Sequence, residues 1–277
     1  MTPAHVHPGP ADTPAALAGP AAAASALLLA AAYLMTAARL RRRGDAWPPY
    51  RDVSFTAGCA ALAWAAAGRS PGGPFTAHMA QHLVVGMAAP LLLVLARPLT
   101  LLLRGTPPGP VRRALRALLG SRPAGWLAAP PVAALLDVGG LWLLYRTGLF
   151  AATGQSGVAR AVVHTHVLLA GTLFTLAVCQ TEPVRRRWGL ALRGGTLLVA
   201  GAAHATLAKS LYATPPPGTS FDPADLHTGA RLMYYGGDLV EVALAVVVAH
   251  QWFTRPVRAG RRRAPTPAAG RRRSRTR

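Results

Sequence analysis

Residues 78–104 read HMAQHLVVGMAAPLLLVLARPLTLLLR, and this stretch decides the fold class. It contains no Asp, Glu, Lys or Arg before Arg97, so its apolar run approaches the ~20 residues that a helix needs to cross a bilayer. Pro90 and Pro98 interrupt the run. Because proline lacks a backbone N–H and clashes with the preceding turn, we expect a kink, or the end of the helix, near Pro98.

Similar uncharged runs recur along the chain, at 13–38, 53–68, 70–96 and 161–181. Of the 277 residues 52% are hydrophobic and 14% are charged, whereas a soluble domain carries about 25% charged residues. The sequence therefore predicts an all-α fold, a polytopic integral membrane protein with a seven-transmembrane-helix bundle. The predicted spans are 17–38, 53–68, 75–103, 125–145, 158–180, 194–212 and 230–253.

The basic residues predict the orientation of the bundle. The chain has 30 Lys and Arg against 9 Asp and Glu, and 24 of the 30 follow predicted spans one, three, five and seven. Cytoplasmic segments of membrane proteins carry this excess of Lys and Arg. We therefore expect the N-terminus outside and the C-terminus inside. Nucleic-acid binding is not expected, because the basic residues lie in segments that separate the membrane spans.

Three regions follow from this reading. We expect residues 1–16 to be a disordered outer N-terminus, 17–254 a transmembrane domain, and 255–277 a disordered cytoplasmic tail. The tail has ten Arg and no acid, so anionic lipid of the inner leaflet is its expected partner. No basic residue precedes the first span, which favours a membrane anchor over a cleavable signal peptide. Cys59 and Cys179 lie within spans and are expected to be packing residues.

Ionisable side chains gather near the outer ends of the predicted spans. At a rise of about 1.5 Å per residue, they lie roughly 5–16 Å below those ends. Such groups cost several kcal/mol in hydrocarbon unless they are paired or ligated, so they are candidate functional residues. They are His78, His82, His164, His166, His204, Asp238 and Glu241.

The histidine spacing indicates a candidate metal site. His78 and His82 are four residues apart and share a helix face, with the thioether of Met79 beside them. Imidazole and thioether ligands suit copper. His164 and His166 point to nearly opposite faces, and His166 fits the common depth better. The candidate metal ligands are thus His78, His82, His166, His204 and Met79, with His164, Asp238 and Glu241 as supporting polar groups. We expect no catalytic site and no enzyme activity.

Four blocks of sequence resemble one known family. They are HMAQH with the AP and RPLTLLLR that follow it, HTHVLLAGTLFTLAVCQTEP at 164–183, GAAHATLAKSLY at 201–212, and GARLMYYGGDLVEVALA at 229–245. Together they are similar to the polytopic CtaG family of cytochrome c oxidase assembly factors, over about residues 20–255. The chain departs from the family pattern at Glu182, where Asp is usual, and in its short, Ala-rich second span.

The resemblance implies a role in building a haem-copper oxidase in the plasma membrane, with the oxidase subunits as partners. It also implies that Cu(I) is handled at the outer side and passed on by ligand exchange. Two other functions remain open from the residues alone. One is a transporter or proton-coupled carrier that uses Asp238, Glu241 and the histidines, although Asp137 and His250 are the sole inner-half candidates. The other is an integral b-type haem protein with bis-imidazole ligation.

Overall fold

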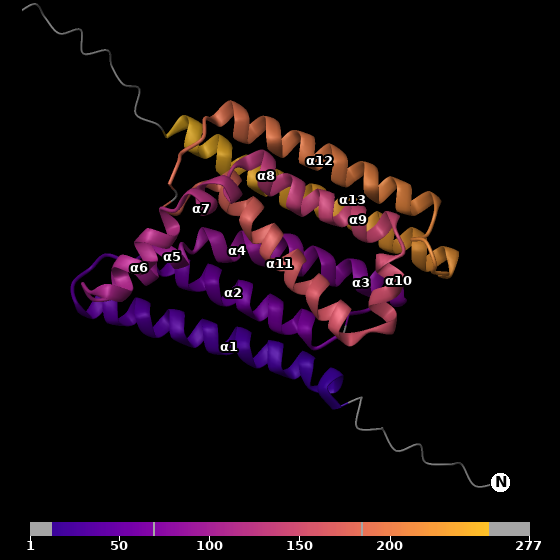
Figure 1. The fold of residues 1–277 in the computed structure, drawn as a ribbon, viewed down its shortest axis with the longest axis horizontal. Coiled ribbons are helices and arrows are strands. Elements are labelled where there is room, and N and C mark those ends of the chain that lie inside the picture. Colours follow the sequence, from indigo (N-terminus) through magenta and orange to yellow (C-terminus); the bar gives the residue numbers. More distant parts are fainter. Residues whose placement is uncertain (1–12, 69, 184, 255–277) are drawn as a thin grey trace, which may run out of the picture.

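The structure is a computed structural model that describes residues 13–68, 70–183 and 185–254. Throughout these residues the chain is helical or irregular, with no strand among them (Figure 1). The predicted disordered regions 1–16 and 255–277 lie outside the described residues, except that residues 13–16 belong to the first helix. The predicted contact of the Arg-rich tail with lipid therefore also lies outside them.

The helices follow the apolar runs, separated by short loops and by prolines at helix starts. In chain order they are α1 (Thr13–Arg42), α2 (Pro49–Ala66), α3 (Pro74–Leu83), the π-helical turn η1 (Val84–Ala88), α4 (Ala89–Leu95), α5 (Pro98–Gly105), α6 (Pro110–Leu119), α7 (Arg122–Leu127), α8 (Pro130–Ala134), the π-helical turn η2 (Leu135–Gly139), α9 (Gly140–Arg146), α10 (Leu149–Gln155), α11 (Gly157–Cys179), α12 (Leu190–Ala213) and α13 (Pro223–Phe253).

Several of these helices are long and apolar enough to cross a membrane, which makes the chain a polytopic membrane protein. Among the described residues they are Gly19–Arg42, Pro74–Leu95, Gly157–Cys179, Leu190–Ala213 and Pro223–Phe253. The segments Pro130–Arg146 and Leu149–Gln155 make a sixth if this pair, bent by 75°, is one broken span. Five or six such spans are fewer than the predicted seven. When the bent pair is counted as one span, the predicted span that is missing is α2. Its 18 residues include Arg51 and Asp52, so its mean hydropathy is too low for a candidate span.

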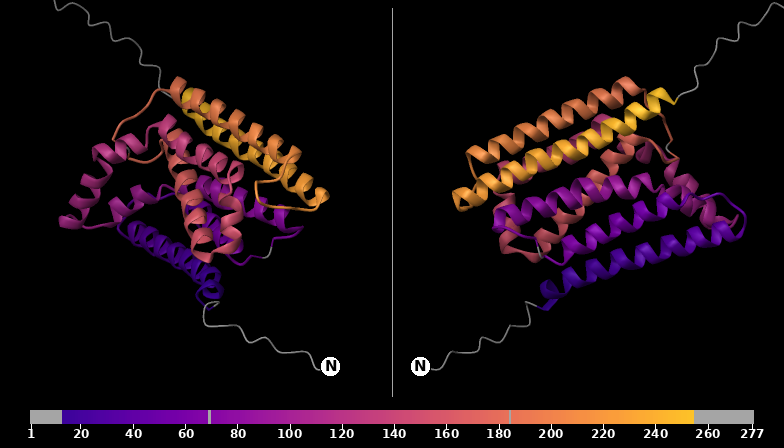
Figure 2. Two further views of the ribbon diagram at one scale, coloured as in Figure 1. Left: turned by 45° about the vertical axis from the view of Figure 1, so that its right-hand side comes forward. Right: turned by 180° about the vertical axis from the view of Figure 1, so that it is seen from behind.

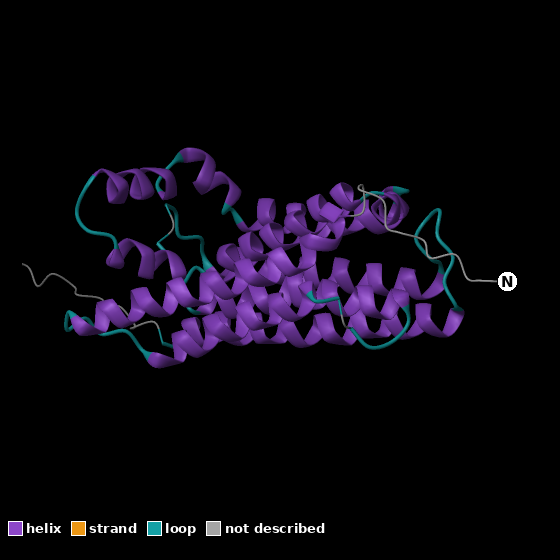
Figure 3. Ribbon diagram, turned by 90° about the horizontal axis from the view of Figure 1, so that it is seen from below, coloured by secondary structure: helices purple, strands orange, loops and turns teal. Residues whose placement is uncertain are grey.

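The long helices lie side by side in a row that α11 crosses. α1 packs on α2, α2 on α4, α3 on α13, and α13 on α12, as the rear view in Figure 2 shows. On the front, α11 crosses η1 and α4 and also contacts α8 (Figure 1). A Cβ atom on Gly171 would lie 1.9 Å from the carbonyl oxygen of Gly86, so this crossing brings two backbones into contact. Figure 3 shows the bundle from below, with α6 and α7 projecting at one end.

The two prolines of the third predicted span have different effects on the helix. The long third span ends at Leu95, Arg97 takes a left-handed conformation with φ of 56°, and α5 begins at Pro98. This confirms the predicted break near Pro98. Pro90 does not end the helix. The π-helical turn η1 comes immediately before it and shifts the hydrogen-bonding register, so the helix continues through the proline.

Other boundaries differ from prediction. α13 begins at Pro223, seven residues before the predicted span, because Asp222 caps it by accepting from the Ala224 and Asp225 N–H groups at 2.9 and 3.3 Å. α6 and α10 were not predicted. α6 is a short amphipathic helix that carries three of the arginines between the third and fourth predicted spans.

The Arg-rich segments lie together at one end of the bundle. These segments are the end of α1, the α5–α7 region and the α11–α12 connection, all on the left of Figure 1. α13 also ends on this side, and the Arg-rich residues 255–277 that follow it lie outside the described residues. The α2–α3, α9–α10 and α12–α13 connections lie at the other end. The structure thus separates the Arg-rich connections from the Arg-poor ones along the long axis of the helices.

A buried carboxylate ties the α11–α12 connection to the start of α5. Glu182 is fully buried and accepts hydrogen bonds from the N–H groups of Leu99 and Thr100 at 2.8 and 2.9 Å and from the Thr100 hydroxyl at 2.5 Å. Burial raises the pKa of the Glu182 carboxyl above its ordinary value, and these hydrogen bonds act against that rise. The helix start that follows Pro98 is therefore capped by a residue more than eighty positions away.

Glu182→Ala should destabilise the protein measurably. The change leaves three donors without a partner, and each unsatisfied buried donor costs about 1–3 kcal/mol. Thermal unfolding of the detergent-solubilised protein measures the loss. Asp45→Ala is the matched control, because Asp45 pairs with Arg104 at an exposed site and such pairs contribute about 0–1 kcal/mol. Equal melting temperatures for the two variants would contradict the capping role.

Candidate functional site

Two histidines meet where α3 and α12 both pack on α13. His82 lies in the last turn of α3, and His204 lies in the middle of α12. Their side chains are 6% and 2% exposed, their ring centroids are 6.0 Å apart, and their ring planes are inclined by 35°. Sequence reasoning placed both residues at one depth, and the structure brings them together.

These two imidazoles lack hydrogen-bond partners for most of their ring nitrogens. The Nε2 of His82 and both ring nitrogens of His204 are buried and accept or donate no hydrogen bond within the described part of the chain. A buried polar group without a partner costs about 1–3 kcal/mol, and native proteins contain few such groups. Three of them within one pair of rings mark this position as a candidate binding site.

Carboxylates from α13 lie next to His204. The Nδ1 of His204 is 3.5 Å from the Oε1 of Glu241, close enough for an ion pair if the ring is protonated. Asp238 lies one turn before Glu241, and it interacts electrostatically with both Glu241 and His204. The histidine pair therefore has acidic neighbours on one side, which would favour a cation between the rings.

Two glycines make room for this arrangement. A Cβ atom on Gly237 would lie 2.3 Å from the Cε1 of His204, and a Cβ atom on Gly201 would lie 2.2 Å from the Oε2 of Glu241. Any larger residue would displace the ring or the carboxylate. Gly237 precedes Asp238 in the Gly-Gly-Asp segment of α13, so this segment supplies the space as well as the charge.

His78 has a different partner from His82. Its Nε2 lies 2.8 Å from the hydroxyl of Tyr145, a fully buried residue at the end of α9, and its ring packs edge-on against Phe150 of α10. The Tyr145 ring also lies edge-on to His82, at 6.3 Å between centroids. Sequence reasoning missed Tyr145. Its hydroxyl at the outer end of the fourth predicted span, at the depth of the histidines, was the signal that could have revealed it.

The two histidines of α11 lie apart from the pair. The Nδ1 of His164 donates to the carbonyl oxygen of Arg160 in its own helix at 2.9 Å, and His164 interacts electrostatically with His78 and His82. His166 is exposed on the bundle surface and bonds the carbonyl of Leu136 in η2 at 3.1 Å. Of the two, His164 interacts with His78 and His82, although sequence reasoning favoured His166.

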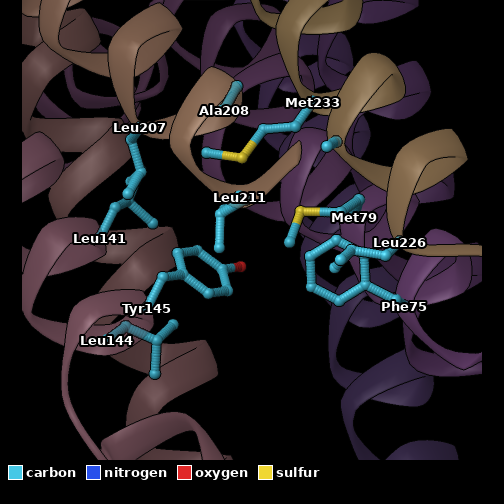
Figure 4. Close-up of a cluster of buried hydrophobic side chains, with 11 residues drawn as sticks. Phe75, Met79, Leu141, Leu144, Tyr145, Leu207, Ala208, Leu211, Leu226 and Met233 are labelled. Carbon is cyan, nitrogen blue, oxygen red and sulfur yellow. The ribbon is translucent and has the colours of Figure 1, made fainter. Parts of the chain in front are cut away.

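The predicted soft ligand Met79 lies in an apolar cluster. It is fully buried and packs with Phe75, Tyr145 and Met233 among the residues that Figure 4 shows. The cluster joins α3, α9, α12 and α13 on the same side as His78. Its thioether thus belongs to the packing that positions the histidines.

The described residues contain no group of three His, Cys, Asp or Glu side chains arranged to hold a metal ion. The arrangement closest to a metal site is the pair of imidazoles of His82 and His204 with their acidic neighbours. Two neutral imidazoles can bind one soft ion such as Cu(I), whereas Zn²⁺ sites in proteins require at least three protein ligands.

Comparison with known proteins identifies a family and several relatives. A family model described as "Cytochrome c oxidase caa3 assembly factor (Caa3_CtaG)" matches residues 31–255. An uncharacterised protein of Mycobacterium bovis is 33% identical over 237 residues, and one of Mycobacterium leprae is 30% identical over 236 residues. The alignments cover 78% and 77% of this chain, but the chain spans about 36% of the length of either relative. No solved structure matches the chain.

The matched region contains the whole candidate site, from His78 on α3 to Glu241 on α13. Membership of an assembly-factor family implies a role other than catalysis. The chain belongs to the Caa3_CtaG family of cytochrome c oxidase assembly factors.

Proposed function

We propose that this protein assists assembly of a haem-copper cytochrome c oxidase by holding Cu(I) between His82 and His204 and releasing it to an oxidase subunit. Family membership supports the assembly role. The observation that carries the copper step is the pair of buried imidazoles with ring centroids 6.0 Å apart, three of whose four nitrogens lack hydrogen-bond partners in the described structure. The ion is cargo, so no redox turnover is required.

The spacing of the rings fits one shared ion. An imidazole nitrogen binds a first-row metal at about 2 Å, so two nitrogens on one ion lie about 4 Å apart. Ring centroids 6.0 Å apart are compatible with such a pair after small rotations of the side chains. Glu241 and Asp238 would favour the positive charge of the ion. The proposal leaves the other predicted ligands outside the copper pair, because His78 contacts the Tyr145 hydroxyl, Met79 packs in the apolar cluster and His166 lies on the bundle surface.

The same proposal includes seven passes through the plasma membrane, with α2 as the least apolar pass and the candidate site near the outer surface. Support comes from the Arg-rich segments among the described residues, which lie at one end of the bundle (Figure 1). His82 lies in the half of the bundle away from those segments, because α3 begins at the Arg-poor end. An outer site would be open to copper supplied from outside the cell.

Loss of either histidine of the pair should abolish tight Cu(I) binding. Even outer-shell changes weaken metal sites by about 10–100-fold. We therefore expect His82→Ala and His204→Ala each to weaken the affinity by more than about 100-fold, in competition titrations of the purified protein with a Cu(I) chelator.

Two control variants separate this site from the other histidines. His166→Ala and His227→Ala should keep an affinity close to that of the unmodified protein, because His166 bonds the Leu136 carbonyl and His227 stacks on Tyr212. Unchanged affinity in His82→Ala or His204→Ala would exclude the paired site. A visible haem spectrum in the purified protein would favour the haem-binding alternative instead.

Chemical labelling tests the orientation. In a variant without Cys59 and Cys179, a cysteine at the exposed position Ser220 should react in intact cells with a maleimide that cannot cross membranes. A cysteine at the exposed position Pro108, between α5 and α6, should react after permeabilisation alone. The reverse pattern would refute an outer site, whatever the copper affinity.

A further inference from the structure

A pocket separate from the histidine pair lies between α12 and α13, toward the end of the bundle where these two helices are connected. It has a volume of about 300 Å³, at the lower end of the roughly 300–1,000 Å³ range of ligand pockets. α12 supplies Ala208, Lys209 and Tyr212, and α13 supplies Ala230, Arg231, Tyr234 and Tyr235. Lys209 is the sole lysine of the chain.

Both cations of this pocket lack an acidic partner. Within the residues that the structure describes, no Asp or Glu oxygen comes within 4 Å of Lys209 or Arg231. The ammonium of Lys209 lies 5.2 Å from the centroid of the Tyr234 ring, and the Arg231 guanidinium donates to the hydroxyl of Tyr212 at 3.2 Å. The contacts orient the two cations but leave their charge without a counter-ion.

The surface beside the pocket is aliphatic. On α13, Tyr235, Leu239, Val242 and Val246 are all more than half exposed, and their spacing of three and four residues places them on one helix face. Leu198 and Val199 of α12 are 76% and 71% exposed. In a membrane-spanning protein these side chains face lipid tails. A cationic, tyrosine-lined pocket therefore adjoins an apolar strip that runs deeper along the same helix.

We propose that this pocket binds the headgroup of an anionic phospholipid, whose acyl chains lie along the exposed strip of α13. The phosphate would accept from Lys209 and Arg231, and the hydroxyl of Tyr212 can donate while it accepts from Arg231. Basic pockets between transmembrane helices bind lipid headgroups in this way, and tyrosine is enriched at the same depth of the membrane.

The charge of the pocket selects among lipids. Two cations without a carboxylate neighbour attract a phosphate, but they repel the additional ammonium of a zwitterionic headgroup. Free phosphate lacks tails to lie on Leu239 and Val242, so it should bind far more weakly than a lipid. The site is independent of copper, since it uses neither His82 nor His204.

Native mass spectrometry of the detergent-purified full chain tests the proposal. The probes are phosphatidylglycerol, phosphatidylcholine and inorganic phosphate, each at the same concentration. We expect one tightly retained phosphatidylglycerol and no comparable retention of the other two. Lys209→Gln combined with Arg231→Gln should weaken phosphatidylglycerol binding by roughly 30-fold. Arg160→Gln, at an exposed position on α11, is the matched control and should bind as the unmodified protein does.

A charge-conserving variant separates lost charge from lost structure. Lys209→Arg combined with Arg231→Lys should retain phosphatidylglycerol. Equal retention of phosphatidylglycerol by the double Gln variant would overturn the proposal. So would equal retention of phosphatidylcholine or of inorganic phosphate by the unmodified protein, or loss of the lipid in the charge-conserving variant.

Discussion

Hydrocarbon offers no water to hydrogen-bond a polar group, and this constraint shapes the whole bundle. Helices satisfy their own backbones, but their ends need partners from elsewhere in the chain. Asp225 of α13 accepts from the N–H groups of Phe75 and Thr76 at the start of α3. Glu182 does the same for α5, and the buried Arg193 donates to carbonyls at the end of α11. Long-range side chains thus cap the starts of α3 and α5 and the end of α11.

The histidine pair differs from these capping residues because it holds three buried polar atoms without a hydrogen-bond partner among the described residues. His82 and His204 are buried, as Glu182 and Arg193 are, but three of their four ring nitrogens form no hydrogen bond in the described structure. Gly237 keeps open the space that the His204 ring occupies, and Glu241 places a carboxylate beside it. A cation held between the rings would satisfy the nitrogens and balance the acid, and it could leave without breaking the fold. This is the physical basis of the proposal that the pair holds copper.

The sequence predicted the helical segments well where both ends are polar, as for 158–180, observed as Gly157–Cys179. The sequence-based prediction started α13 too far along the chain. The apolar pattern does not reveal that Asp222, in a polar loop, caps the helix. The rise per residue of a helix was enough to predict that the polar residues lie at one depth in the membrane. His82 and His204, two of these residues, do come together in the structure. Spacing within one helix cannot say which residue of another helix faces it. For that reason Tyr145, the partner of His78, was not anticipated.

X-ray absorption at the copper edge of the Cu(I)-loaded protein tests the paired site most directly, because it reports the ligand atoms themselves. Binding between His82 and His204 predicts two imidazole nitrogens at about 2 Å and no sulfur ligand. It also predicts that the two-imidazole signal disappears in His204→Ala. A sulfur scatterer at about 2.3 Å, or an unchanged spectrum in His204→Ala, would contradict copper binding by this pair.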